Sequence, residues 1–383
     1  MQLRFAHRAY QLRFKSPVRT AHGVWSVREG ILLRVETEAG GVGYGEAAPI
    51  PWFGMAENAE AEQWLRSLDG VLSLEDLARV PAELACVRSA FLAAAEGAGV
   101  PLALLAPGPC SEGGESRGVG DPASETEPSG GKGNGSAAPA GTGGAGPSAV
   151  APRAHLQMAA LLPAGRAALD KARERVDLGF RCLKWKVGVG DAADELAILD
   201  DLCGLLPEGA RLRLDANGAW DRRRAERWLE RCADRPVEFV EQPVAADVRG
   251  AEDLLLGLAQ DFPTKLALDE SVVSDADLER WLGLGWPGLY VLKTSLLADP
   301  RARLARLARE KAGVVFSSAL ETRIGAKRLL RLALDWPGEA RAVGAGVWPL
   351  FEDARFDGPF AAPFFRFSEL STLNEEQTWN ALS

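Results

Sequence analysis

Five short apolar runs follow one another along the second half of the chain, and each ends in a charged side chain. The last charged residues of these runs are Lys186, Asp215, Glu241, Asp269 and Lys293, at intervals of 29, 26, 28 and 24 residues. A strand of about five residues, a helix of three or four turns and two loops span such an interval. The spacing therefore predicts five successive βα units, each with a charged group at the carboxyl end of its strand.

Three more apolar runs complete an eight-stranded pattern. Residues 155–163 precede the five runs, residues 312–318 and 341–346 follow them, and residues 165–178 have helical spacing. Strands that alternate with helices in this way form a parallel barrel. We therefore predict an α/β fold with a barrel over residues 150–348.

The chain before the barrel predicts a smaller α+β capping domain, over residues 1–106. Residues 3–14 and 30–38 have the pattern of strands, and residues 57–68 and 82–97 have apolar positions at helical spacing. The aromatic residues of the C-terminal segment predict that it packs back on this cap.

Two segments complete the predicted domain organisation. Residues 107–149 are rich in Gly, Ser, Pro and Ala, and Val119 is their only large apolar residue. A segment of this composition cannot bury enough apolar surface to offset its loss of entropy, so we predict a disordered insert. The C-terminal segment that packs on the cap is residues 349–383.

The charged strand ends predict a specific chemistry. In a parallel barrel the carboxyl ends of the strands converge on one face, where such barrels carry their active sites. Three converging carboxylates repel one another, and a hard divalent cation such as Mg²⁺ relieves that repulsion. A lysine near a metal and a second ammonium has a lowered pKa and can act as a base. One such charge is usually a solvated loop residue, but five in register predict proton abstraction next to a carboxylate, with an enediolate held at the metal.

The composition excludes several other classes of function. The net charge of −9 argues against a nucleic-acid surface, and no apolar run has the length of a membrane span or a signal peptide core. Five cysteines without a CxxC pair indicate reduced thiols, and three dispersed histidines are too few for a zinc site. We expect a cytoplasmic protein that acts on a small carboxylate, with no nucleic-acid or membrane partner, as a monomer or a homo-oligomer.

These motifs resemble those of a known group of enzymes. The carrying residues are the KxK of Lys184 and Lys186, the DAN, EQP and DES triplets that begin at Asp215, Glu241 and Asp269, Lys293, and GYGEAAPIPWFG over residues 43–54. Together they resemble the muconate-lactonizing branch of the enolase superfamily and, within it, the o-succinylbenzoate synthase family of menaquinone and phylloquinone biosynthesis. The resemblance implies a (β/α)₇β TIM-like barrel with an α+β cap.

The resemblance also implies an activity, the Mg²⁺-dependent syn dehydration of 2-succinyl-6-hydroxy-2,4-cyclohexadiene-1-carboxylate to 2-succinylbenzoate. The implied ligands of Mg²⁺, or of Mn²⁺ as an alternative metal, are Asp215, Glu241 and Asp269. Lys186 is the implied base, and then the acid that helps hydroxide leave as water. Lys293 would stay charged and stabilise the enediolate, and Lys184 could keep Lys186 neutral through like-charge repulsion.

Five further residues are expected to contact or support the substrate. Ser317 and Ser318 either hold the succinyl carboxylate or cap a helix, and Asn217 supports a ligand or a water molecule. Trp52 either walls the pocket or simply packs, and the wall is the interpretation that the resemblance favours. Gly288, before the sixth strand, is expected to give the ring room.

Two other functions stay open at this point. Two opposed lysines also suit a two-base epimerisation, as in N-acylamino-acid racemases and dipeptide epimerases of the same superfamily. A dipeptide epimerase is expected to carry an acidic motif after the eighth strand, where this chain has only the more distant Glu352 and Asp353. The non-enzymatic alternative is a barrel with the insert as an interaction tether, which would require broken lysines or ligands.

Overall fold

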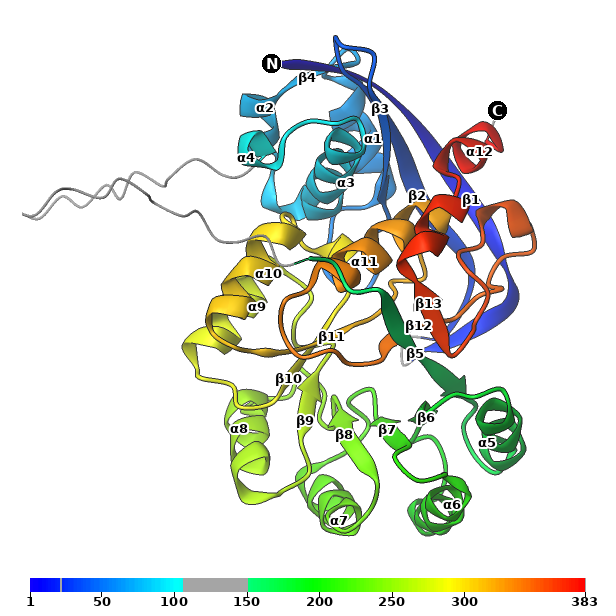
Figure 1. Cartoon of the computed structure of the whole chain (residues 1–383). Helices are drawn as coiled ribbons and strands as arrows, with labels where there is room; N and C mark the ends of the chain where they lie inside the picture. Colours follow the sequence, from blue (N-terminus) through cyan, green and yellow to red (C-terminus); the bar gives the residue numbers. More distant parts are fainter. Residues whose placement is uncertain (21–22, 106–150, 383) are drawn as a thin grey trace, which may run out of the picture. The chain divides into compact units, whose positions relative to one another are not determined.

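Eight parallel strands carry the predicted charged residues. The structure is a computed structural model that describes residues 1–20, 23–105 and 151–382 (Figure 1); the predicted insert lies outside the described residues. The strands are paired in the order β11-β10-β9-β8-β7-β6-β5-β12, and a bridge between Ser317 and Gly344 joins the two ends. They are β5 (His155–Leu162), β6 (Cys182–Lys186), β7 (Arg211–Asp215), β8 (Val237–Glu241), β9 (Leu266–Leu268), β10 (Leu289–Leu292), β11 (Gly313–Phe316) and β12 (Val343–Gly346).

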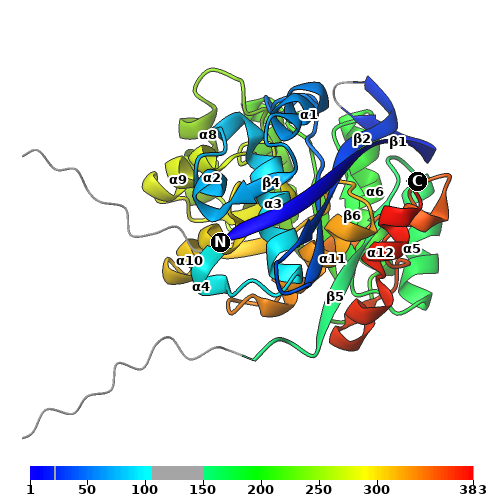
Figure 2. The same ribbon diagram turned by 90° about the horizontal axis from the view of Figure 1, so that it is seen from above.

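Seven helices connect these eight strands within the described residues. They are α5 (Ala167–Asp177), α6 (Ala192–Leu205), α7 (Arg222–Cys232), α8 (Ala251–Asp261), α9 (Asp275–Gly283), α10 (Pro300–Arg309) and α11 (Arg323–Asp335). Helices α5 to α10 lie outside the strands (Figures 1 and 2). The predicted (β/α)₇β TIM-like barrel is therefore confirmed.

Polar side chains fix where several of these helices begin. Asp191, Asp221, Ser274, Asp299 and Thr322 each accept a hydrogen bond from a backbone N–H group in the first turn of the helix that follows. Each cap satisfies a donor that the helix itself leaves unpaired. The helices therefore begin immediately after the βα loops that follow the carboxyl ends of the strands.

The cap is an antiparallel sheet covered by helices. The sheet has the order β3-β2-β1-β4, with β1 (Gln2–Thr20), β2 (Gly23–Glu36), β3 (Val42–Ala47) and β4 (Val71–Ser73). Helices α1 (Asn58–Arg66), α2 (Leu74–Ala78), α3 (Ala85–Gly97) and α4 (Leu102–Leu105) follow. A Cβ atom on Gly43 or Gly45 would lie 2.0 or 1.9 Å from a carbonyl oxygen of α3, so only glycine permits this packing.

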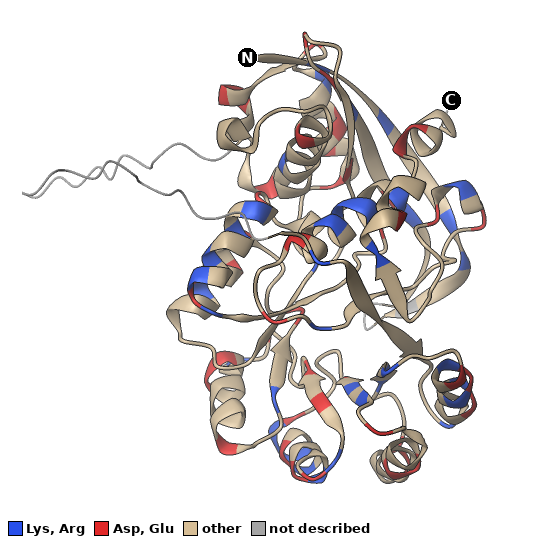
Figure 3. Ribbon diagram, viewed as in Figure 1, with Lys and Arg blue, Asp and Glu red and all other residues tan. Residues whose placement is uncertain are grey.

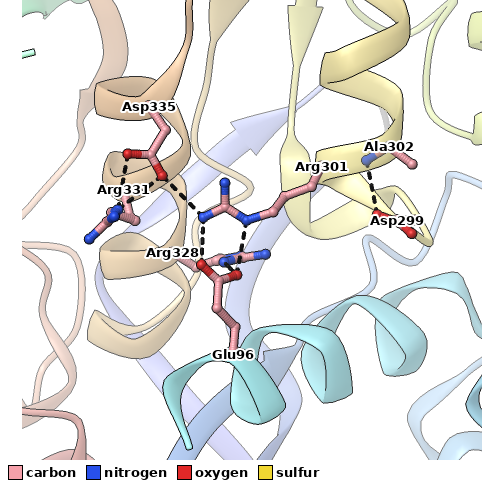
Figure 4. Close-up of polar contacts among 7 residues, drawn as sticks. All are labelled: Glu96, Asp299, Arg301, Ala302, Arg328, Arg331 and Asp335. Carbon is pink, nitrogen blue, oxygen red and sulfur yellow. Dashed lines mark hydrogen bonds and ion pairs between the residues drawn. The ribbon is translucent and has the colours of Figure 1, made fainter. Parts of the chain in front are cut away.

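Ion pairs connect the cap to the barrel helices. The Glu96 carboxylate at the end of α3 pairs with the guanidinium groups of Arg301 on α10 and Arg328 on α11, and Arg301 also pairs with Asp335 at 3.1 Å (Figure 4). Figure 3 shows that basic residues follow one another along α10 and α11. These paired charges therefore fasten α3 of the cap to α10 and α11, through residues that do not line the cavity at the strand ends.

The C-terminal segment contacts both parts of the fold. It contains η3 (Ala354–Phe356), β13 (Phe364–Arg366), η4 (Phe367–Thr372) and α12 (Glu375–Asn380). Strand β13 pairs with β5 of the barrel, and the ring of Phe351 stacks on Phe14 of β1. Arg8 of β1 donates a hydrogen bond of 2.6 Å to the Trp379 carbonyl. Within the described residues, no helix has both the length and the apolar character needed to cross a bilayer.

Candidate active site

Strand pairing places the five predicted charged residues side by side. Lys186 pairs with Asp215, and Asp215 pairs with Glu241, across the parallel strands β6, β7 and β8. Asp269 directly follows β9, and Lys293 directly follows β10. Because these strands are consecutive around the barrel and parallel, the five residues lie at the same end of it.

A cavity of about 870 Å³ opens at this end of the barrel. Barrel loops form one side of it, and the cap contributes Trp25, Ile50, Trp52 and Phe53. The predicted site residues that line it are Trp52, Lys184, Lys186, Asp215, Asn217, Asp269, Lys293, Ser317 and Ser318. The structure therefore gathers nearly the whole predicted set around one space that is open to a small molecule.

Lys184 lies against two of the carboxylates. Its Nζ atom is 3.0 Å from Asp215 Oδ2 and 2.6 Å from Glu241 Oε1. Burial favours the neutral amine, but the charges of Asp215, Glu241 and Asp269 outweigh this effect and raise the pKa of Lys184. Lys184 is thus a fixed ammonium group that partly neutralises the acidic residues.

Glu241 lies beneath the cavity rather than on its surface. Its residue is 1% exposed, and it contacts the cavity residue Lys184. Burial, with the charges of Asp215 and Asp269, raises the pKa of Glu241 to about 8 in spite of Lys184. Burial and the neighbouring carboxylates therefore disfavour the charged form of this carboxyl group.

Lys293 closes the other side of the acidic group. Its ammonium contacts Asp269 and lies 5.7 Å from the centre of the Phe53 ring, which belongs to the cap. Burial opposes the charged form, but Asp269 and Glu270 raise the pKa of Lys293, so this lysine is held as a cation. The sequence did not indicate the role of Phe53, because a cation–π contact across two domains has no local pattern.

The loop that carries Asp269 is held by Gln242, a residue to which the sequence assigned no role. Gln242 is fully buried, and its Oε1 accepts hydrogen bonds from the backbone N–H groups of Asp269 at 3.0 Å and Ser271 at 3.1 Å. Its Nε2 donates to Val244 O and to Ser271 Oγ, both at 2.8 Å. Gln242 thus ties the end of β8 to the end of β9, which fixes the spacing of Glu241 and Asp269.

Asn217 supports a fourth acidic group. Its Nδ2 donates a hydrogen bond of 3.0 Å to Glu270 Oε1. Burial and the neighbouring Asp269 raise the pKa of Glu270 to about 7. Glu270 Oε2 and Asn217 Oδ1 are buried without a hydrogen-bond partner among the described residues. These two oxygens are acceptors that face the acidic group, and a cation or a donor at this place would satisfy them.

The donor chemistry of the site fits a hard divalent cation. Asp215, Glu241 and Asp269 repel one another, and carboxylate oxygens are the ligands that Mg²⁺ prefers. Among the described residues, no three His, Cys, Asp or Glu side chains are grouped as a metal site, and Lys184 and Lys293 contact the carboxylates instead. The ammonium groups thus take the charge-balancing role, and the orphaned oxygens of Asn217 and Glu270 add two acceptors.

The two serines after β11 do not cap a helix, because Thr322 is the N-cap of α11. Ser318 Oγ donates to Glu321 Oε2 at 3.1 Å and accepts from Leu320 N at 2.9 Å, and Ser317 N donates to Leu292 O at 2.9 Å. Both serines line the cavity. The alternative of a helix cap was therefore wrong.

Gly288 is not brought to the cavity. It directly precedes β10, whereas Lys293 directly follows it, so the two lie at opposite ends of the strand. A Cβ atom there would lie 2.4 Å from Leu266 O and 2.6 Å from the Trp286 indole. The expectation that Gly288 gives the substrate room is corrected: its small size instead permits the close packing of Trp286.

Known proteins agree with this architecture. The family model "Enolase C-terminal domain-like" matches residues 167–295. An o-succinylbenzoate synthase of Thermosynechococcus vestitus is 37% identical over 353 residues, which cover 90% of this chain and 94% of that protein. A hydrophobic dipeptide epimerase of Roseobacter litoralis is 39% identical over 28% of this chain and 33% of its own.

A solved structure extends the likeness to three dimensions. The crystal structure of an o-succinylbenzoate synthase from Thermosynechococcus elongatus, complexed with Mg in its active site, has a TM-score of 0.73 and 33% identity and covers 99% of each chain. The chain therefore belongs to the enolase superfamily. The structure of an N-succinyl Arg/Lys racemase from Bacillus cereus also covers 99% of this chain, with a TM-score of 0.74, but at 14% identity it shows the fold alone.

Proposed function

We propose that this protein is an o-succinylbenzoate synthase, a lyase that dehydrates 2-succinyl-6-hydroxy-2,4-cyclohexadiene-1-carboxylate to 2-succinylbenzoate. The observation that carries the proposal is the one cavity in which Lys186 and Lys293 lie with the acidic residues of β7 and β9, in a chain that matches such a synthase along nearly its full length. The K-x-K and D-E-D pattern supports the finer placement in the muconate-lactonizing branch.

The chain's own lysines have different roles, with both proton transfers assigned to Lys186 and charge stabilisation to Lys293. Lys186 removes the proton next to the substrate carboxylate, so that the C–H bond breaks and an enediolate forms. The C–O bond of the ring hydroxyl then breaks, and the same lysine returns its proton to the departing hydroxide as water, which makes the elimination syn. Lys293, held as a cation by Asp269, stabilises the developing negative charge. The ring becomes aromatic, which favours the products.

Lys184 acts on the acidic residues rather than on the substrate. Its contacts with Asp215 and Glu241 keep it charged beside Lys186, two residues away on the same strand. A neighbouring ammonium disfavours protonation of a second amine. This is the role that we propose for it.

Asp215, Glu241 and Asp269 would hold the metal. Mg²⁺, or Mn²⁺ in its place, supplies a positive charge beside the substrate carboxylate, which makes the neighbouring proton more acidic. Asn217 and Glu270 border this group and would orient it.

The other walls of the cavity suit the succinyl arm and the ring. Trp25, Ile50, Trp52 and Phe53 form an apolar surface from the cap, and Ser317 and Ser318 bring polar groups from the barrel. We propose that the serines and their backbone amides hold the distal carboxylate and that Trp52 walls the ring. The free thiols Cys86, Cys182, Cys203 and Cys232 suit a reducing cytoplasm, where the product would enter quinone biosynthesis.

N-acylamino-acid racemisation is the second candidate, because Lys186 and Lys293 come from strands on either side of the acidic group and suit a two-base reaction. Dipeptide epimerisation has less support. Glu352 and Asp353 are not among the residues that line the cavity, and Asp353 instead pairs with Arg355 at 2.6 Å.

The decisive test offers both substrates to the purified protein with Mg²⁺. Formation of the aromatic product is followed by absorbance, and loss of chirality of an N-succinyl amino acid is followed by circular dichroism. We expect aromatic product at a kcat/KM at least ~10²-fold above that for racemisation, since differences of a few kcal/mol in transition-state binding separate substrates. Racemisation without dehydration would replace the proposed function with the second candidate.

A further inference from the structure

Arg28 is a buried cation that the proposed reaction does not use. It lies on β2 and is 1% exposed. A guanidinium has five N–H donors, and all five are occupied by backbone carbonyls. The acceptors are Leu320 O at 3.2 Å, Glu29 O at 2.9 Å, Pro49 O at 2.7 Å, Ala48 O at 2.5 Å and Ala319 O at 3.3 Å.

These carbonyls belong mainly to two loops that wall the cavity. Ala48 and Pro49 follow β3 and lead directly to Ile50, Trp52 and Phe53, which line it. The barrel loop after β11, residues 317–320, lines it from the other side. One side chain therefore joins the cap wall to the barrel wall at their backbones.

The barrel loop is held in a conformation that a leucine seldom adopts. Leu320 has a φ of 61°, in the left-handed region, and its side chain borders the cavity. Its N–H group donates to Ser318 Oγ at 2.9 Å, and its carbonyl accepts from Arg28 Nε. A non-glycine residue keeps such a conformation only where its surroundings fix it. Arg28 supplies the hydrogen bond to the Leu320 carbonyl that helps to fix it.

Arg28 also orders the aromatic wall. Its guanidinium carbon lies 5.0 Å from the centre of the Trp25 ring, and Trp25 packs edge-on against Trp52 with ring centres 4.9 Å apart. Both rings line the cavity. No carboxylate among the described residues lies at ion-pair distance from Arg28, so this buried charge is compensated by the loop carbonyls themselves.

We propose that Arg28 is a positioning residue, which sets the shape of the cavity wall that receives the substrate's succinyl arm. The identity of the substrate in this proposal rests on the proposed function, whereas the contacts of Arg28 do not depend on it. It predicts a split effect: substrate binding depends on Arg28, whereas proton transfer by the barrel lysines does not. Lysine cannot replace it fully, because an ammonium has three donors for five acceptors.

The test compares Arg28→Met, Arg28→Lys and a matched control, Glu96→Gln. The control weakens another contact between the cap and the barrel, made by residues that do not line the cavity (Figure 4). We expect KM to rise about tenfold in Arg28→Met and about threefold in Arg28→Lys, with kcat within about threefold, because misplaced binding groups cost affinity while the reacting groups stay in place. Glu96→Gln should lower Tm and leave both constants within about twofold.

Hydrogen exchange separates this inference from the proposed function. In Arg28→Met, the amides of residues 46–53 and 317–322 should exchange faster than in the wild type, while those of strands β6 to β8 should exchange at the wild-type rate. In the Glu96→Gln control, exchange in residues 46–53 and 317–322 should stay unchanged. If the wild type fails to dehydrate the cyclohexadiene but the exchange pattern appears, the function is wrong and the positioning role stands. Unchanged exchange in both loops, or a KM within twofold of wild type, would overturn the role of Arg28.

Discussion

Two clusters of buried charge lie inside the same barrel, and their charges are balanced in different ways. At the carboxyl ends of the strands, Lys184 is shared between Asp215 and Glu241. Towards the amino ends, the Glu238 carboxylate is shared between two guanidinium groups, with Arg213 Nε at 2.7 Å and Arg341 Nη1 at 2.8 Å. In the first cluster two carboxylates share one ammonium group, whereas in the second each arginine has a carboxylate partner, since Arg341 also pairs with Glu339 at 2.5 Å.

The pKa directions follow from this difference. Burial and neighbouring carboxylates raise the pKa of Glu241 to about 8. Burial also acts on Glu238, but Arg213 and Arg341 outweigh it and lower the pKa of Glu238. A cluster that satisfies its charge within the chain stabilises the fold, whereas a cluster with unbalanced charge is prepared for something that the chain does not provide. The same residue types thus stabilise the fold at one end of the barrel and, in the proposed function, take part in the chemistry at the other.

Removal of divalent metal should have the largest effect. Chelation with EDTA is expected to reduce turnover to background, because the proposed reaction needs a cation to acidify the substrate, and added Mg²⁺ should restore it. The check is turnover before chelation, after it, and after Mg²⁺ is returned. Turnover that persists in EDTA would mean that the surplus carboxylates do not serve a metal.

Lys186→Ala should come next in size. We expect kcat to fall by about 10³-fold or more, since a positioned base contributes on the order of 10²–10⁴ and here serves twice. The circular dichroism spectrum and Tm should stay close to those of the wild type. Substantial turnover by the folded variant would remove Lys186 from the proposed mechanism.

The two clusters can be compared directly through Glu238→Gln and Glu241→Gln. Glu238→Gln leaves the buried Arg213 guanidinium without its carboxylate partner, while Arg341 keeps its ion pair with Glu339, so we expect the free energy of unfolding to fall by about 3 kcal/mol. Glu241→Gln removes a repelled charge, so the metal-free protein should keep its stability within about 1 kcal/mol and lose turnover.

Denaturation in urea, and the Tm shift on adding Mg²⁺, measure both expectations. The Mg²⁺-dependent shift should survive in Glu238→Gln and disappear in Glu241→Gln. The opposite pattern would contradict the division of roles between the two ends of the barrel.

The smallest expected effect concerns pH. Burial, with a contribution from Glu46, raises the pKa of Glu321 from 4.5 to about 7. The folded state then binds more protons than the unfolded state between these values, so this group's contribution to stability is lost as pH rises. Relative to Glu321→Gln, the wild type should lose about 1 kcal/mol per pH unit between pH 5 and 7. Parallel stability curves for the two proteins would exclude a raised pKa.

The sequence predicted the barrel and its charged strand ends because both depend on local regularities. An apolar strand followed by a charge is visible in one dimension, and parallel pairing turns the repeat into a cluster without further information. Lys186, Asp215 and Glu241 each end their strand as expected, and Asp269 and Lys293 follow theirs by one residue.

The features that the sequence did not predict depend on contacts between distant backbones. Arg28 stands next to Glu29 in a strand, so the sequence around it is that of a solvated arginine. Its acceptors are backbone carbonyls, which every residue has, so no sequence pattern marks them. Gln242 could not be predicted for the same reason, since its side-chain amide accepts hydrogen bonds from backbone N–H groups of another loop. Gly288 was correctly expected before its strand, but the role expected for it was wrong, because residues before a barrel strand lie away from the active face.

The side-by-side pairing of Lys186, Asp215 and Glu241 has a consequence for how this enzyme can change. Side chains alternate between the two faces of a strand, so a shift of one residue would point one of these charged side chains away from the strand-end site and towards the helices. Insertions and deletions within these strands would therefore misplace the charged side chains, in natural variants and in engineered ones. New substrates must be sought by rebuilding the connecting loops, around strands whose lengths are left untouched.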